Sequence, residues 1–224
     1  FGLLDAVPER EILEWADPDD RNHNGISGRA NRQPDGKVGR FGRKATGAGL
    51  DDFNAGAFLI EQGITSPALP VEETIGGRPL PPGVDPVAEP ELSGEDLQLV
   101  DDFVRFLAPP IPLPLDKEGE RGRLIFGSIG CASCHRPALV TGPSPVKALN
   151  HKRVQAWTDL LLHDMGAERG DICLGLATPA EFRTEPLMGL RLATVFLHDG
   201  AAKSIEEAIR LHDGHPSAPF APRR

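Results

Sequence analysis

The chain has 224 residues, enough for one large domain or two small ones, and it carries a formal net charge of −9. This acidic balance argues against nucleic acid as a partner, and because the sequence has no long apolar run we expect no membrane span. Aromatic residues make up only 5% of the chain, so a large flat cofactor would supply core volume that aromatic side chains usually fill. The 25 glycines and 22 prolines predict long irregular loops.

Helix-start residues, apolar spacing and proline stops together predict five helices. They span residues 8–16, 51–62, 93–107, 118–129 and 205–211. Ser93 and Ser204 are the expected N-caps of the third and last helices. We place a domain boundary in the proline-laced stretch 111–115, which divides the chain into an N-terminal lobe, 1–110, and a second domain, 111–224. The expected fold is mainly α, with a lobe rich in loops, proline and glycine at the N-terminal side.

A polar turn follows the first predicted helix. Asp20, Asn22, Asn24 and Gly25 occupy positions one, three, five and six of a calcium-binding loop, where oxygen ligands and a sharp turn are needed. The twelfth position, however, is Asn31 in place of the usual glutamate. The alternative is a turn in which these short polar side chains bond to their own backbone. A calcium site and a self-bonded turn therefore both stand as interpretations.

The strongest chemical signal is Cys131-Ala132-Ser133-Cys134-His135, the C-x-x-C-H pattern of a c-type haem attachment site. Two thiols three residues apart on a helical turn lie on one face, so both can reach the vinyl groups of one porphyrin, and His135 is then held beneath the iron as its proximal ligand. A zinc half-site would need a second thiol pair, and the remaining Cys173 is isolated. A redox dithiol would need a βαβ context. We therefore expect one covalent haem c.

Haem attachment also bears on location. Covalent haem is added outside the cytoplasm, so we expect a periplasmic protein, although three cysteines are too few for the disulfide framework of a small secreted domain. The first residues, Phe1 to Leu4, show neither the basic region nor the apolar core of a signal peptide. We therefore expect the sequence to start within a longer one.

The remaining motifs form an ordered series along the chain. They read Gly25-Ile26-Ser27-Gly28-Arg29, Gly39-Arg40-Phe41-Gly42, Gly63-Ile64-Thr65-Ser66, Leu161-Leu162-His163-Asp164-Met165-Gly166, Glu181-Phe182-Arg183-Thr184-x-Pro186-Leu187-x-Gly189, Phe196-x-His198-Asp199-Gly200 and Glu207-Ala208-Ile209-x-x-His212-x-Gly214. In this order they resemble the di-haem thiol oxidoreductase-like family, which is related to bacterial di-haem cytochrome c peroxidases and to the di-haem enzymes that mature methylamine dehydrogenase. The resemblance covers nearly the whole chain. It implies two cytochrome c-like domains, of which 1–110 resembles the rear of the first and 111–224 the second.

The chain departs from that family in two respects. It carries only the second C-x-x-C-H motif, which implies that a longer sequence or a partner chain supplies the other haem. Arg43 stands where the family usually has a tryptophan that looks like an electron bridge between the haems. Glu61 falls where the related peroxidases place an acid–base carboxylate, a catalytic role that needs the first haem opposite it. The alternative for Glu61 is a solvated residue at a helix end.

The iron held by His135 takes a ligand on its other face or keeps that position open. The resemblance to the peroxidases implies His212 as this distal ligand, while His198 resembles a structural group near the haem edge. Met165 and Met188 are the alternative ligands. Two imidazoles make a low-potential haem, whereas histidine with methionine raises the potential. His151, His163 and His215 are further candidates for the distal ligand.

Three functions stay open at this point. The resemblance implies an oxidoreductase of the di-haem peroxidase class, in which this haem passes electrons to a catalytic haem elsewhere. One alternative is a stand-alone electron carrier or redox subunit without peroxidase activity. The other is a structural subunit in which haem only stabilises a loop-rich fold. The expected partners are a redox protein, which an acidic surface could dock if that protein is basic, and a chain or segment with the second haem.

Overall fold

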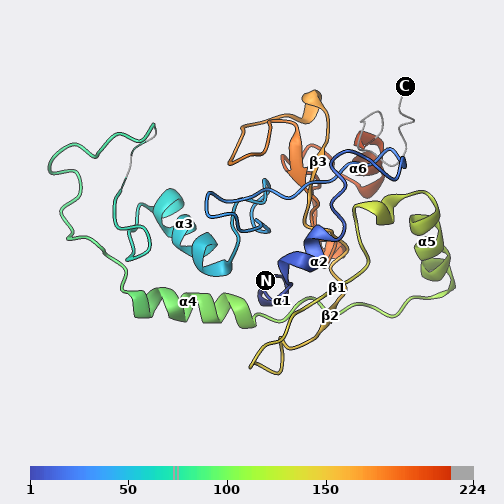
Figure 1. The fold of residues 1–224 in the computed structure, drawn as a ribbon, viewed down its shortest axis with the longest axis horizontal. Coiled ribbons are helices and arrows are strands. Elements are labelled where there is room, and N and C mark those ends of the chain that lie inside the picture. The colour runs from blue at the N-terminus through green and yellow to red at the C-terminus, as the bar shows by residue number, and fades with distance from the viewer. Residues whose placement is uncertain (73, 75, 213–224) are drawn as a thin grey trace.

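The computed structural model describes residues 1–72, 74 and 76–212, and Figure 1 shows their arrangement. Its helices are α1 (Gly2–Asp5), α2 (Glu9–Leu13), α3 (Leu50–Gln62), α4 (Gly94–Phe106), α5 (Lys117–Ser128) and α6 (Ile205–Leu211). Its strands are β1 (Leu139–Val140), β2 (Arg153–Val154), β3 (Leu162–Asp164) and β4 (Glu181–Arg183), and single turns of 3-10 helix form η1 (Cys131–Ser133), η2 (Ala167–Arg169) and η3 (Leu190–Leu192). Among the residues described, no helix is both long enough and apolar enough to cross a bilayer.

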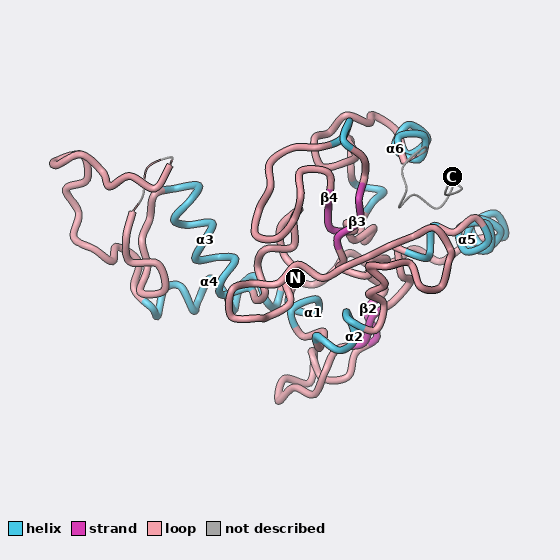
Figure 2. Tube along the Cα trace, turned by 45° about the horizontal axis from the view of Figure 1, so that its top comes forward, coloured by secondary structure: helices cyan, strands magenta, loops and turns pink. Residues whose placement is uncertain are grey.

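The expectation of a mainly α fold is wrong. The described chain is 30% helical and 11% strand, and Figure 2 shows that loops make up most of the trace. The physical reason lies in the many glycines and prolines, which interrupt helices and leave segments that must satisfy their backbone groups across the chain. They do so through two small antiparallel sheets, β1–β2 and β3–β4, and through isolated bridges such as Arg29 with Leu162.

The predicted helices form where local chemistry specifies their ends. Ser93 accepts a hydrogen bond from the backbone N–H of Asp96 at 3.1 Å, and Ser204 accepts one from Glu207, also at 3.1 Å. Gly63 ends α3 in the left-handed conformation, with a φ of 69°. The helix expected over 8–16 is shorter, because Pro8 is its N-cap and the backbone tightens to 3-10-type bonds after Leu13.

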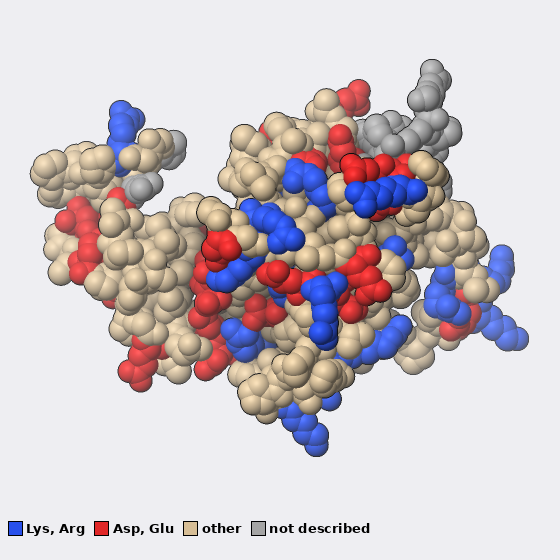
Figure 3. Space-filling model, in the orientation of Figure 1, with Lys and Arg blue, Asp and Glu red and all other residues tan. Residues whose placement is uncertain are grey.

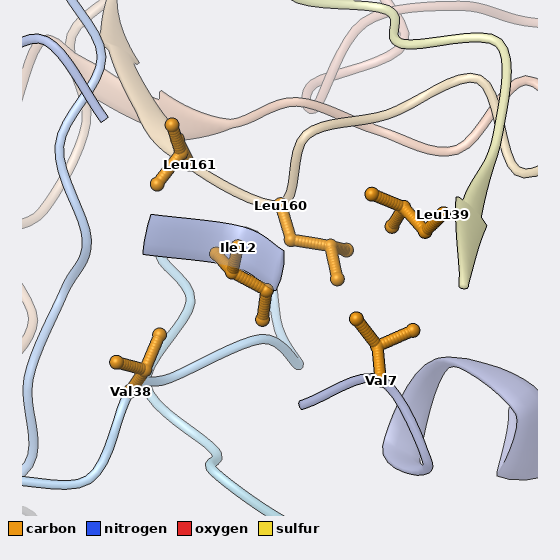
Figure 4. Packing of buried hydrophobic residues seen from close by; sticks show 6 residues of the cluster. All are labelled: Val7, Ile12, Val38, Leu139, Leu160 and Leu161. Carbon is orange, nitrogen blue, oxygen red and sulfur yellow. The ribbon is translucent and has the colours of Figure 1, made fainter. Parts of the chain in front are cut away.

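The core lies between the N-terminal helices and the strand segments of the second half (Figure 4). Its largest cluster joins residues that are distant in sequence, and all of them are at most 1% exposed: Val7, Ile12, Val38, Leu139, Leu160 and Leu161. Burial of each such side chain contributes roughly 1.5–3 kcal/mol. The leucine pair just before β3 is therefore the point on which the N-terminal segments pack.

Buried hydrogen bonds and an ion pair also connect the two predicted halves of the chain. Asn31 is 1% exposed; its amide N–H group donates to the carbonyl oxygens of Lys44 and Leu174, at 2.8 and 3.3 Å, and its amide oxygen accepts from Leu176 N–H at 3.1 Å. Arg29 forms a two-point ion pair with Glu181, with N···O distances of 2.6 and 2.5 Å. The division into 1–110 and 111–224 stays a prediction, and these contacts cross it.

Candidate functional site

The C-x-x-C-H motif forms a tight turn at the end of α5. Gly130 takes a φ of 92°, which lets the chain leave the helix and enter η1 at once. The N–H of His135 donates to the carbonyl of Cys131 at 3.0 Å, so the motif closes as one turn. Both cysteines are half-buried free thiols. The turn therefore presents two thiols and one imidazole from a single short segment.

His135 is held in the form that binds iron. Its Nδ1 lies 3.0 Å from the carbonyl oxygen of Trp157, and because a carbonyl can only accept, Nδ1 carries the proton and Nε2 keeps its lone pair. The pKa of His135 is lowered, mainly because the ring is buried. The hydrogen bond to Trp157 acts in the opposite direction and raises the pKa, while a charge on His212 lowers it. Phe126 of α5 lies beside both rings, with its centroid 5.4 Å from that of Trp157.

Behind Cys134 lies a buried polar pair. Nδ1 of His163 is 3.5 Å from Sγ of Cys134, and Nε2 of the same ring is 2.8 Å from Oδ2 of Asp159. Asp159 is 1% exposed and His163 is 5% exposed. His163 is one of the candidate ligands expected from the sequence, whereas Asp159 is not. The signal was a polar pair, Thr158 and Asp159, within an apolar run, since a buried polar group needs a partner.

His212 ends α6 on the side of the motif. Its Nδ1 donates to the Ala208 carbonyl at 2.7 Å, which leaves Nε2 as the free ring nitrogen, and its charge acts on His135. Ser204 caps the helix that carries it. His212 is close enough to His135 for a charge on its ring to lower the pKa of His135, and its role as distal ligand stays a prediction.

The competing ligands are placed differently. Met188 packs against the buried cluster around Leu4 and Phe41, so its side chain contributes to the core. Met165 is half-buried after β3 and is not tied to that cluster. His198 is stacked on Phe182 with ring centroids 3.9 Å apart. His151 is exposed on a loop, and His215 lies outside the described residues.

The surroundings of the motif fit a flat apolar macrocycle. Neither α5 nor α6 buries a residue, and the two helices lie on the same side of the molecule (Figure 1). Large apolar side chains on these helices and on η3 are exposed: Leu124, Ile125, Leu192, Ile205 and Ile209. Arg136, directly after His135, has a buried Nε without a hydrogen-bond partner. Exposed apolar side chains near the motif are the kind of surface that a porphyrin ring covers, whereas the guanidinium of Arg136 lies over the Trp15 ring, 3.7 Å from its centroid.

The structure does not bring the other predicted site residues to this place. Glu61 is exposed near the end of α3, across the molecule from α5 (Figure 1), so its catalytic role stays a prediction. In the proposed calcium loop, Asp20, Asn22 and Asn24 each accept a backbone N–H bond through a side-chain oxygen, at 3.1, 3.0 and 2.9 Å. These bonds form the self-bonded turn, while calcium binding stays a prediction.

One family of known proteins matches nearly the whole chain. The family model described as "di-haem oxidoreductase, putative peroxidase" matches residues 1–220. No curated protein and no solved structure shows significant similarity to the chain. The matched range contains residues 131–135, Asp159, His163 and His212.

Proposed function

The chain belongs to the di-haem oxidoreductase family, and from this premise we propose that Cys131, Cys134 and His135 hold one covalent haem c that exchanges electrons with a second haem. The observation that carries the proposal is the geometry of His135, whose Nδ1 proton is held by the Trp157 carbonyl while Nε2 keeps its lone pair. Haem iron supplies one-electron redox chemistry when bound. The chain supplies two thiols for attachment and a neutral imidazole as the proximal ligand.

His212 is the proposed distal ligand. Its place at the end of capped α6 and its Nε2, which the bond from Nδ1 to Ala208 leaves available, support this assignment. Two histidine ligands would give the haem a low reduction potential, which suits transfer of electrons to a catalytic haem. The use of Met188 in the core disfavours it as the rival, and Met165 is the remaining thioether alternative.

The second haem comes, in this proposal, from a longer sequence or a partner chain, and Glu61 would act as its acid–base carboxylate. Because covalent haem is added outside the cytoplasm, the proposed location is the periplasm. The proposed electron donor is a redox protein. Figure 3 shows basic and acidic side chains interspersed over the centre of one face, with acidic ones gathered around α4, so a basic partner would find its complement there.

One experiment separates the haem c assignment from non-covalent haem. Acid–acetone extraction should leave haem on the wild-type polypeptide, while the Cys131→Ala, Cys134→Ala double variant should lose it. His151→Ala, an exposed histidine, serves as the matched control and should keep covalent haem. Haem that extracts fully from the wild type would refute the proposal.

The haem-loaded protein also serves to test the identity of the distal ligand and the proposed lack of peroxidase activity of this chain alone. His212→Ala should turn the ferric haem high spin, whereas Met165→Ala and Met188→Ala should stay low spin. We also expect negligible peroxide turnover from this chain alone, because the proposed haem has both axial positions filled. Peroxide turnover at the level of a dedicated peroxidase would instead favour an open iron, and low-spin haem in His212→Ala would favour methionine ligation.

A further inference from the structure

Asn24 is followed by a glycine in an exposed turn, and these two residues can react with each other. The backbone nitrogen of a following residue can attack a side-chain amide, and a glycine, which has no Cβ, leaves that approach unhindered. Asn22, Asn31, Asn54 and Asn150 are each followed by a residue that carries a Cβ. Asn24 is therefore the asparagine of this chain whose neighbour best permits the attack.

The loop holds both reacting groups in polarised form. The N–H of Gly25, the nucleophile, donates to Oδ1 of Asp20 at 3.1 Å, and Asp20 is 2% exposed. The side-chain oxygen of Asn24, where negative charge develops, accepts the N–H of Ile26 at 2.9 Å. A carboxylate on the nucleophile acts as a general base, and an N–H on the developing oxyanion stabilises it. Asn24 itself is exposed, so water reaches the site.

Two aspartates show why the residue type matters at this position. Asp35 and Asp199 also precede a glycine, and Oδ1 of each accepts the N–H of the second residue on, at 3.0 Å. An ionised carboxylate is a poor electrophile, whereas the amide of Asn24 is neutral and can lose ammonia. The turn at Asn24 therefore combines the favourable geometry with a side chain that can be attacked.

We propose that Asn24 is a site of self-catalysed deamidation, with Gly25 as the nucleophile and Asp20 as the base. The Gly25 nitrogen forms a bond to Cγ of Asn24 as its proton passes to the Asp20 carboxylate. The bond from Cγ to the side-chain nitrogen then breaks, and this nitrogen leaves as ammonia with the proton from Asp20. Water opens the resulting succinimide at one of its two carbonyls, which gives aspartate or isoaspartate. One amide and one water become one carboxylic acid and one ammonia, with no oxidation or reduction.

The reaction changes the loop in charge and in length. Each product adds one negative charge beside Asp20, and isoaspartate also adds one carbon to the main chain. Asp20 and Ile26 anchor the loop on either side of the reacting pair, at 2% and 7% exposure. A longer main chain cannot keep both anchors and the bond from Gly25 to Asp20, so the reaction loosens the loop irreversibly.

The wild-type protein contains its own control. The full chain is incubated at neutral pH in water enriched in the heavy oxygen isotope, which marks each deamidation event, and is then digested with trypsin. Residues 22–29 form one tryptic peptide that holds Asn22 and Asn24, and fragmentation in the mass spectrometer separates the two sites. The side-chain oxygen of Asn22 also accepts a backbone N–H, at 3.0 Å, but His23 follows it. We expect Asn24 to react faster than Asn22 by about 10-fold or more.

A variant and unfolding test the part played by the folded loop. Asp20→Asn keeps an oxygen that accepts the Gly25 N–H but removes the charge, and should slow the reaction at Asn24 on the order of 10-fold. Asp19→Asn makes the same replacement at an exposed position of the loop and should leave the rate unchanged. In guanidinium chloride, which breaks the contacts to Asp20 and Ile26, the wild type should react at Asn24 more slowly than in the folded state. This comparison holds even if Asp20→Asn does not fold.

The outcomes decide whether the folded loop assists the reaction or protects Asn24 from it. A reaction faster at Asn24 than at Asn22, slowed in Asp20→Asn and slower in the unfolded chain supports the inference. Equal rates at Asn24 and Asn22, an unchanged rate in folded Asp20→Asn, or a faster reaction at Asn24 on unfolding overturns it. These results leave the haem c assignment untouched, because none of the reacting residues belongs to the haem site.

Discussion

Two neighbouring cations, Arg43 and Lys44, share one carboxylate and offer a direct test of how burial sets the strength of an ion pair. Nζ of Lys44 lies 2.9 Å from Asp171 with its side chain 0% exposed, whereas Nε of Arg43 lies 2.8 Å from the same carboxylate with its side chain 48% exposed. Lys44 also donates to three backbone carbonyls of the loop before and within β4, at 2.7 to 3.2 Å. Its ammonium lies 3.5 Å from the Phe182 ring centroid.

Replacement of Lys44 by methionine keeps the length of the side chain and removes its charge. The carbonyl oxygens of Thr178, Pro179 and Glu181 then lose a donor, and the carboxylate of Asp171 loses its buried partner. We expect the free energy of unfolding to fall by about 3–5 kcal/mol. Arg43→Met, the matched control, should cost only about 0.2–1 kcal/mol because its ion pair is half exposed.

Urea unfolding followed by far-UV circular dichroism measures both variants. With a typical urea dependence of about 1–3 kcal/mol per molar, the midpoint for Lys44→Met should fall by roughly 2 M, while that for Arg43→Met should hardly move. Addition of Asp171→Asn to Lys44→Met should restore part of the loss, because it removes a carboxylate that has lost its buried partner and keeps only the half-exposed Arg43. Equal shifts for the two single variants would show that burial does not decide the energetics of this carboxylate.

Three further predictions concern stability around the site. The pKa of His163 is raised in the folded chain, so its ion pair with Asp159 stabilises the folded state fully below a pH of about 6.5. This stabilisation is lost as the pH rises through the raised pKa. In a Cys134→Ser background, the free energies of unfolding of the chain with Asp159 and of Asp159→Asn, measured with urea, should therefore converge at alkaline pH. Leu160→Ala should cost about 2–5 kcal/mol by calorimetry, because Leu160 is fully buried. Ser204→Ala should destabilise α6 by about 0.5–2 kcal/mol and speed hydrogen exchange of its first turn.

Each of these predictions has a result that contradicts it. A stability gap between wild type and Asp159→Asn that widens with rising pH would mean that His163 is not the charged partner. Leu160→Ala should be compared with Leu99→Ala on the exposed face of α4, and equal costs would contradict the position of the core. Unchanged exchange in Ser204→Ala would show that the cap does not hold α6.

Local chemistry made part of this molecule predictable from sequence. The caps at Ser93 and Ser204 act within three residues, so the helices that they begin are found where expected. The C-x-x-C-H turn is equally local. The mainly α expectation failed because the segments between helices are joined by pairings such as β3 with β4, which connect residues about twenty positions apart and leave no periodic pattern in so few residues.

The candidate site was predictable to the same local extent. His135 and both cysteines follow from spacing alone, whereas the contact of His163 with Cys134 crosses 29 positions and depends on how β3 is placed. The carbonyl of Trp157 that holds His135 belongs to the backbone, so residue identity gives no indication of it. Periodicity and spacing describe neighbours along the chain, and these contacts are neighbours only in space.

The hydrogen bonds of Asn31, which join segments 44 and 174–176, limit how this protein could change by mutation. Asn31 occupies the twelfth position of the loop that begins at Asp20, where a calcium site would need glutamate. A carboxylate could still accept the N–H of Leu176, but it could not donate to the carbonyls of Lys44 and Leu174. A single step toward a complete calcium consensus would therefore loosen the tie between distant segments. Residue 31 can serve as a calcium ligand or as a hydrogen-bonding link between distant segments, and in this chain Asn31 forms the link.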